Sequence, residues 1–235
     1  ELVVICRGGD THWVTLADTI SQGRVAGARV IDLVPYGRLA REALAARIAA
    51  EKARDPLVPV TVIVPSNYAG LSVRRALAAT LPVVNVHFMV AARLAEILGA
   101  PTLAAEARSP LTPWVRFQAV RAVLSEEPGV FSAVAGHPAT ARELQRVFAE
   151  LREVTPAAKQ RLARTSPRAA DVIRLYERYR VLTSGFFDEI DLMDAAARAV
   201  ANPAAAETIG AGILYLPRKL APALQRFLAA ASAQG

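Results

Sequence analysis

The chain has 235 residues, 53% of them hydrophobic, and a formal net charge of +7 at pH 7. No apolar run approaches the roughly 20 residues that cross a bilayer, so no membrane association is expected. The single cysteine, Cys6, and three widely spaced histidines lead us to expect neither an internal disulfide nor a bound metal. The first residues also lack the features of a signal peptide, which predicts a cytoplasmic protein.

The basic charge suggests nucleic acid as a partner, because the sequence pI is about 10.2. Almost all of the 28 basic residues are arginine in an alanine-rich chain, a composition that biased codon usage also produces. The excess of positive charge lies within the first 180 residues. We therefore expect any DNA-binding surface to lie in that part of the chain.

Short runs rich in β-branched residues predict buried strands, and segments at helical spacing between them predict helices. The expected strands are 2–6, 29–34, 60–64, 83–86 and 212–216. The expected helices of this part are 39–54, 68–79, 89–98 and, after the last strand, 219–231. Alternating strands and helices predict an α/β fold with a parallel sheet and helices on both of its faces.

The pattern changes to helices alone between residues 113 and 201, where apolar residues recur at helical spacing. Thr112-Pro113 and Ser166-Pro167 are the expected helix starts. The sequence thus predicts an all-helical insertion over residues 102–206. The α/β domain would then consist of residues 1–101 and 207–235.

A phosphate-binding loop is expected where a strand leads into a helix, and residues 31–42 are the best-placed candidate. A working P-loop needs a lysine and a hydroxyl after its glycines. Here Pro35, Gly37 and Arg38 remain of such a loop, and Leu39-Ala40 stand where the lysine and hydroxyl would be. Arg38 is at least as well explained as a surface arginine. Arg7-Gly8-Gly9-Asp10 is a second glycine-bearing turn, and an ordinary loop explains it.

The strand at 212–216 ends without the acid that a nucleotide hydrolase uses to hold magnesium, since Tyr215 is followed by Leu216-Pro217-Arg218. Asp188 and Asp191 lie three residues apart at an expected helix start, where acids are favoured in any case. Without further ligands they do not predict a metal or catalytic pair. We expect no catalytic residue and no cofactor in this chain.

Two segments offer chemistry for holding a nucleic-acid strand. Polar side chains and an aromatic ring follow the strand at 60–64, and two arginines lie one turn further on. The second segment follows the next expected strand. The candidate DNA-binding residues are Pro65, Ser66, Asn67, Tyr68, Arg74, Arg75, His87 and Phe88. A helix cap with a packed tyrosine explains the first segment equally well, and a structural histidine explains the second.

Together these segments resemble the first motor domain of superfamily 1 helicases of the UvrD type. The degraded loop, Val64-Pro65-Ser66-Asn67, the segment 89–94, and Phe187 to Leu192 follow the order of that family's motifs. Within that group, the chain resembles more closely the N-terminal region of the B subunit of AddAB-type helicase-nucleases. That resemblance implies a P-loop-NTPase-like (RecA-like) fold with a helical insertion like subdomain 1B.

The resemblance implies an ATPase-inactive module that channels single-stranded DNA and serves as a scaffold for an AddA-type partner subunit. The family's nuclease, of the PD-(D/E)xK type, lies C-terminal to this region, so the whole protein could carry that activity. Two alternatives remain open: a protein-interaction scaffold that binds no DNA, and an enzyme acting on another phosphate ligand. The arrangement of arginines around residues 65–75 and around His87 distinguishes the DNA-binding helicase-like module from the scaffold that binds no DNA.

Overall fold

A computed structural model describes residues 2–7, 28–80, 84–218 and 220–233. The chain divides into two compact units. The first combines Glu1–Thr102 with Leu192–Gly235, and the second is Leu103–Asp191. Each unit has a hydrophobic core of its own.

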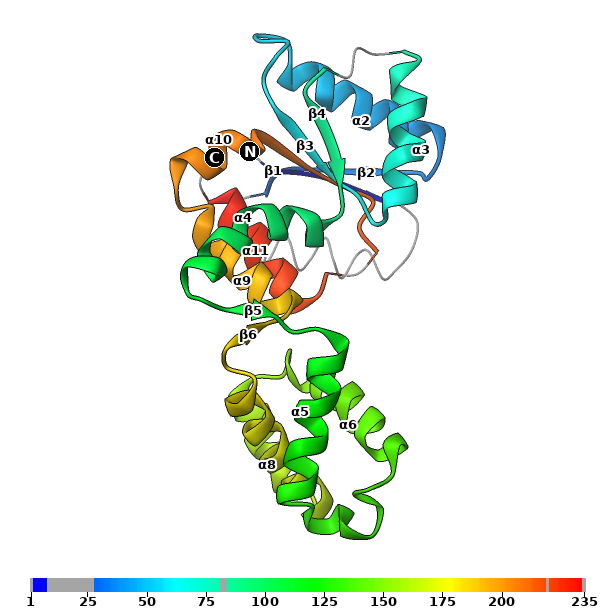
Figure 1. Ribbon diagram of the computed structural model, residues 1–235. Helices are drawn as coiled ribbons and strands as arrows, with labels where there is room; N and C mark the ends of the chain where they lie inside the picture. The colour runs from blue at the N-terminus through cyan, green and yellow to red at the C-terminus, as the bar shows by residue number, and fades with distance from the viewer. Residues whose placement is uncertain (1, 8–27, 81–83, 219, 234–235) are drawn as a thin grey trace. The chain divides into compact units, whose positions relative to one another are not determined.

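The first unit is built on a five-stranded parallel sheet in the order β2-β1-β7-β3-β4 (Figure 1). Its strands are β1 (Leu2–Arg7), β2 (Ala28–Val34), β3 (Val60–Ile63), β4 (Val86–Met89) and β7 (Ala211–Tyr215). Strand β7, from the C-terminal part of the chain, lies between β1 and β3. The predicted α/β class with a parallel sheet is confirmed.

Helices cover both faces of this sheet, as Figure 1 shows. On one face lie α2 (Arg38–Glu51) and α3 (Asn67–Ala78), and on the other lie α4 (Ala91–Ala105), α9 (Glu189–Ala199) and α11 (Pro222–Ser232). The short helix α10 (Pro203–Ile209) leads into β7. Strand residues are buried on both sides because helices cover both faces, which is why β3 is apolar along its length apart from Thr61. The Thr61 hydroxyl is satisfied by donating to the carbonyl of Ile209 at 2.7 Å.

The second unit is a helical bundle of α5 (Pro113–Glu126), α6 (Pro138–Leu151), α7 (Pro156–Ala163) and α8 (Pro167–Leu182), with a 3₁₀ helix at Gly129–Val134. Thr112 and Ser166 cap α5 and α8 through their side-chain oxygens, which confirms the predicted helix starts. Two-residue strands, β5 (Ser109–Pro110) and β6 (Phe186–Phe187), pair where the chain enters and leaves the bundle. The predicted all-helical character thus holds except at this pair.

Two expectations differ from the structure. The fourth strand was predicted at 83–86, yet β4 spans Val86–Met89, because Asn85 turns the chain with a positive φ of 51° just before it. Val83 lies outside the described residues. The insertion was predicted to run to residue 206, whereas the second unit ends at Asp191, and Leu192 onward belongs to the first unit.

Candidate nucleic-acid interface

The carboxyl ends of all five strands lie at one edge of the sheet, because the strands are parallel. Two of the connections that leave this edge were singled out by sequence. Residues 35–37 join β2 to α2, and residues 64–66 join β3 to α3. Crevices outside the carboxyl ends of strands are where open α/β sheets bind ligands.

The connection between β3 and α3 is fixed by a backbone hydrogen bond at Val64, and its next two residues are exposed. The Val64 amide donates to the carbonyl of Met89 at 2.9 Å, which extends the pairing of β3 with β4. Val64 is buried, whereas Pro65 and Ser66 are exposed. The Ser66 hydroxyl accepts a hydrogen bond from the Ala69 amide at 3.2 Å and so caps α3. Ser66 is therefore a helix cap, as one of the two readings of this segment proposed.

Helix α3 packs very closely on the sheet through Gly70. A Cβ at this position would lie 3.1 Å from Cγ2 of Val64 and 3.5 Å from Cβ of Phe88. Val73 and Leu77 complete the buried face of the helix. This close contact fixes which face of α3 is directed to solvent.

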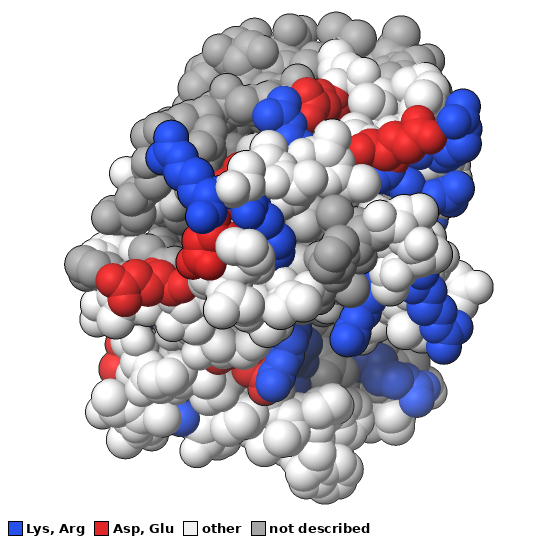
Figure 2. Space-filling view, turned by 90° about the horizontal axis from the view of Figure 1, so that it is seen from above, with Lys and Arg blue, Asp and Glu red and all other residues white. Residues whose placement is uncertain are grey.

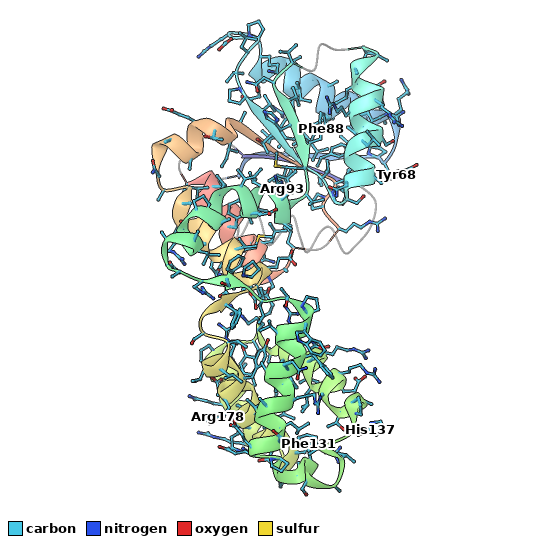
Figure 3. The ribbon with its side chains drawn as sticks, viewed as in Figure 1. Tyr68, Phe88, Arg93, Phe131, His137 and Arg178 are labelled. Carbon is cyan, nitrogen blue, oxygen red and sulfur yellow. The ribbon has the colours of Figure 1, made fainter. Side chains whose placement is uncertain are left out.

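The solvent-facing side of α3 carries an aromatic ring, Tyr68, and an arginine, Arg75, one above the other along the helix. At about 100° per residue, Tyr68 and Arg75 lie opposite the buried face, and Leu71 lies beside them. Tyr68 is 82% exposed and Leu71 is 47% exposed. Figure 3 shows the Tyr68 side chain near the start of α3, where it projects outward from the helix. The packed-tyrosine reading of this segment is therefore wrong.

Arginines 74 and 75 are available to an external partner. Both are exposed, and within the described ranges neither side chain makes an ion pair or a hydrogen bond. Asn67, at the first helical position, is also exposed. Figure 2, seen from above the view of Figure 1, shows basic side chains spread over that face, some of them beside acidic ones.

His87 and Phe88 do not belong to this surface in the way the sequence suggested. Both lie inside β4 and not after it, because the strand starts three residues later than predicted. The Phe88 side chain is partly buried against the core under α3. The His87 ring is exposed, but it pairs through Nε2 with Oδ1 of Asn85 at 3.1 Å, before the strand begins. Asn85 and His87 therefore lie toward the amino end of β4.

The connection after β2 is too short for a phosphate-wrapping loop. Only Pro35, Tyr36 and Gly37 separate β2 from α2, and Gly37 has a φ of 100°, a conformation that favours glycine. Arg38 pairs with Glu42 one turn along the helix at 2.8 Å. This pairing supports the interpretation of Arg38 as a surface arginine. The residues at 8–10 lie outside the described residues.

A pocket of about 420 Å³ lies between β2 and α2. Its walls are strand residues and the alanines of α2, and its polar groups are Asp32 and Arg47. These two form a two-point ion pair, with N–O distances of 2.8 and 3.1 Å. The arginine charge is thus already matched, which leaves the pocket poorly suited to a phosphate.

The end of β7 carries no acid. Tyr215 is buried, and this burial raises the pKa of its phenol despite the nearby positive charge of Arg41. Leu216 turns the chain with a positive φ of 46°, and the next residue, Pro217, is buried. In the part of the chain that the structure describes, no group of three or more His, Cys, Asp or Glu side chains could hold a metal ion.

The structure also reveals a polar cluster that sequence reasoning missed. Asp188 and Asp191 face Arg108 and Arg152 in the second unit, with N–O distances between 2.5 and 3.1 Å. Arg152 lies 36 positions from Asp188 and 39 from Asp191 in the sequence, so no local sequence pattern could have predicted these pairs. The acids cap the start of α9 through backbone hydrogen bonds as well. These contacts give both acids a structural role at the start of α9.

Comparisons with protein-family models and with curated proteins gave no match. Within the described residues, no helix combines the length and the hydrophobicity that crossing a membrane requires.

Proposed function

We propose that this chain is an ATPase-inactive, helicase-like module that binds single-stranded DNA at the carboxyl edge of its sheet. The observation that carries the proposal is the outward face of α3, where Tyr68 is 82% exposed and Arg75 follows two turns later. A ring that can stack on bases and a guanidinium that has no partner among the described residues lie on one face, and binding of a single strand uses these two groups. Ser66 and Asn67 lie at the end of this face nearest the sheet.

The resemblance of the chain to AddAB-type helicase-nucleases extends this proposal to the fold and the assembly. The fold would be of the P-loop-NTPase (RecA-like) type, and the module would belong to the B subunit of an AddAB-type helicase-nuclease in the cytoplasm. In such an assembly an AddA-type subunit would supply ATP hydrolysis. The three-residue connection after β2 and the missing acid after β7 support a module without ATPase activity of its own.

A protein-interaction scaffold is the second candidate, and the same surface gives it support. Exposed Tyr68 and Leu71 beside arginines also have the composition of a protein-binding hot spot. The two candidates differ in what substitution of the ring does to DNA binding. An effect on single-stranded DNA favours the helicase-like module.

The test is fluorescence anisotropy of the full chain with a labelled single-stranded oligonucleotide at low salt. Stacking of a base on an aromatic ring contributes about 1–3 kcal/mol, so Tyr68→Ala should weaken binding by about fivefold or more. Tyr68→Phe keeps the ring and should bind like the unmodified chain. Trp114→Ala, which removes an aromatic side chain that is 68% exposed on α5, is the control. Equal binding by all four proteins would reject the assignment of this surface to DNA.

A further inference from the structure

Three arginines surround the turn between α7 and α8 in the second unit. Helix α7 ends at Ala163 and α8 begins at Pro167, so the turn is three residues long. Arg161, Arg164 and Arg168 are all exposed there. Over the ranges that the structure describes, none of their side chains has an ion-pair or hydrogen-bond partner. We refer to these three residues as the tip cluster.

The positive charge of the tip cluster is not balanced locally. No acidic residue occurs between Glu153 and Asp171. Asp171 is already engaged, because it accepts from the Val130 amide at 2.7 Å and pairs with Arg174 at 3.0 Å. Arg146 and Arg226, by contrast, are exposed arginines that pair with acids. Among the described residues, the three arginines of this turn thus have no acidic partner.

Lys159 lies in the same stretch but does not belong to the cluster. Its ammonium is 3.8 Å from Glu177 and 4.5 Å from the centre of the Tyr176 ring. The side chain is only 15% exposed, so it serves the packing of α7 on α8. The three arginines are therefore the groups that an external ligand would meet.

Helix stability explains only part of the tip cluster. Arg161 lies in the last turn of α7 and Arg164 is its C-cap residue, and cations are favoured at that end of a helix. Arg168 lies in the first turn of α8, where the helix dipole disfavours a cation. Arg168 therefore opposes helix stability and lies where an anionic ligand would offset it.

We propose that the tip cluster binds the phosphate backbone of double-stranded DNA. Guanidinium groups match phosphate oxygens in geometry and charge. No aromatic residue occurs between residues 154 and 170, so the turn can contact phosphates but cannot stack on bases. Contacts to phosphates without stacking suit a duplex, whereas binding of a single strand relies on stacked bases.

This inference rests on the proposed DNA-binding function and adds a second site to it. The two sites differ in chemistry. The face with Tyr68 and Arg75 carries a ring for unpaired bases, and the tip cluster carries charge alone. Duplex and single-stranded probes should therefore respond to different substitutions.

The experiment compares two triple variants of the full chain that each lose three positive charges. The first is Arg161→Gln, Arg164→Gln and Arg168→Gln. The control is Arg146→Gln, Arg178→Gln and Arg226→Gln, three exposed arginines that each pair with an acid. Binding to a labelled duplex of about 20 base pairs is measured by anisotropy over a range of salt concentrations.

The tip triple variant should bind the duplex about tenfold more weakly at low salt, and its log–log salt slope should fall by about two to three. The control triple variant should stay within about twofold of the unmodified chain, because its arginines are already neutralised by their partners. The tip variant should change its melting temperature little, because the favourable helix-end charges of Arg161 and Arg164 are lost together with the unfavourable one of Arg168. Arg168→Gln alone should lower the slope by about one.

Equal losses in both triple variants would reject the tip cluster as a site and indicate a general effect of net charge. Failure of the unmodified chain to bind duplex would reject it too, while single-strand binding that depends on Tyr68 would still support the proposed function. If the tip variant loses duplex binding but Tyr68→Ala binds single strands normally, the tip cluster stands and the site at α3 fails. No binding to either probe would reject both.

Discussion

Arg152 donates from Nη2 to Oδ1 of Asp191 across 2.5 Å, although the two residues lie 39 positions apart in sequence. The same guanidinium donates from Nε to Asp188 at 3.0 Å, and Arg108 reaches the other oxygen of Asp191 at 3.1 Å. The side chains of Arg152 and Asp191 are 16% and 11% exposed. The cluster ties the C-terminal end of α6 to the segments through which the chain enters and leaves the helical unit.

Removing one partner of this cluster should destabilise the protein strongly. Arg152→Met leaves two largely buried carboxylates without their main counter-charge, and such one-sided removal costs about 3 kcal/mol. Urea unfolding of the full chain measures the loss. Arg226→Met, which breaks an exposed pair with Asp194, is the control and should cost less than about 1 kcal/mol. Similar losses in the two variants would show that the cluster contributes no more than a surface ion pair.

The cluster should also make stability depend on pH in the acid range. Burial alone would raise the pKa of Asp191, but the hydrogen bond from the Asp188 backbone and the charges of Arg152 and Arg108 hold it below its ordinary value of 3.8. A depressed carboxyl pKa contributes stability that is fully present above the unfolded value and is lost as pH falls through the folded value.

Asp191→Asn should therefore flatten the fall in unfolding free energy below about pH 4. Urea unfolding at a series of pH values from 6 downward, about half a unit apart, measures this fall. Asp194→Asn removes one carboxylate elsewhere and serves as the comparison. If the unfolding free energy of Asp191→Asn falls below pH 4 as steeply as that of the unmodified chain, Asp191 is not a source of the pH dependence.

A close helix contact in the first unit predicts a second stability effect. A Cβ at Gly99 in α4 would lie 2.6 Å from the carbonyl oxygen of Leu192 and 3.0 Å from the amide nitrogen of Ala196. Backbone atoms cannot move aside as a flexible side chain can, so Gly99→Ala should cost about 3 kcal/mol. Gly136→Ala, where nothing lies within 4 Å, should change stability by less than about 0.5 kcal/mol. Thermal unfolding of both variants compares them, and a neutral Gly99→Ala would show that α4 and α9 can separate slightly.

We expect no binding of Mg-ATP. Residues 35–37 offer one glycine and neither a lysine nor the serine or threonine hydroxyl of a P-loop, and β7 ends without a carboxylate for magnesium. Isothermal titration calorimetry of the full chain with Mg-ATP is the direct measurement. A dissociation constant in the micromolar range would contradict the ATPase-inactive interpretation.

Strands were predicted well from the sequence where turn residues flank their apolar runs. The run 60–64 became β3 within one residue because Pro59 and Pro65 flank it. The strand predicted at 83–86 was misplaced because Val83 and Val84 have high β-propensity, whereas the structure turns at Asn85 and pairs the residues after it. The composition of the segment does not show whether the residues before Asn85 or those after it pair with β3.

The candidate site was predictable only where it depends on local structure. Ser66 as a cap and Tyr68 one residue into α3 follow from sequence near a strand end. The exposure of Tyr68 does not, because a tyrosine beside a cap packs or projects according to how closely the helix lies on the sheet. The close approach of α3 to the sheet at Gly70 and Val64 is a tertiary contact, which sequence alone does not give. The helical-wheel position of Leu71 relative to Tyr68 was a signal in the sequence that could have marked the same face.

Ser66 caps α3 and is also proposed to contact DNA, and substitutions can separate these two roles. Aspartate and asparagine cap helices about as well as serine, so both Ser66→Asp and Ser66→Asn should keep the unfolding free energy. Ser66→Ala removes the acceptor of the Ala69 amide and should cost about 1 kcal/mol. Only aspartate adds a negative charge at the edge where the single strand is proposed to lie.

Ser66→Asp should therefore weaken binding of single-stranded DNA without loss of stability. Two unit charges about 7 Å apart in water interact by about 0.6 kcal/mol, which corresponds to about a threefold loss of affinity at low salt. The loss should shrink as salt rises, because the Debye length falls to about 8 Å at physiological ionic strength. Ser66→Asn controls for side-chain size and should bind normally. Should aspartate and asparagine bind DNA equally well at low salt, the strand does not pass the start of α3.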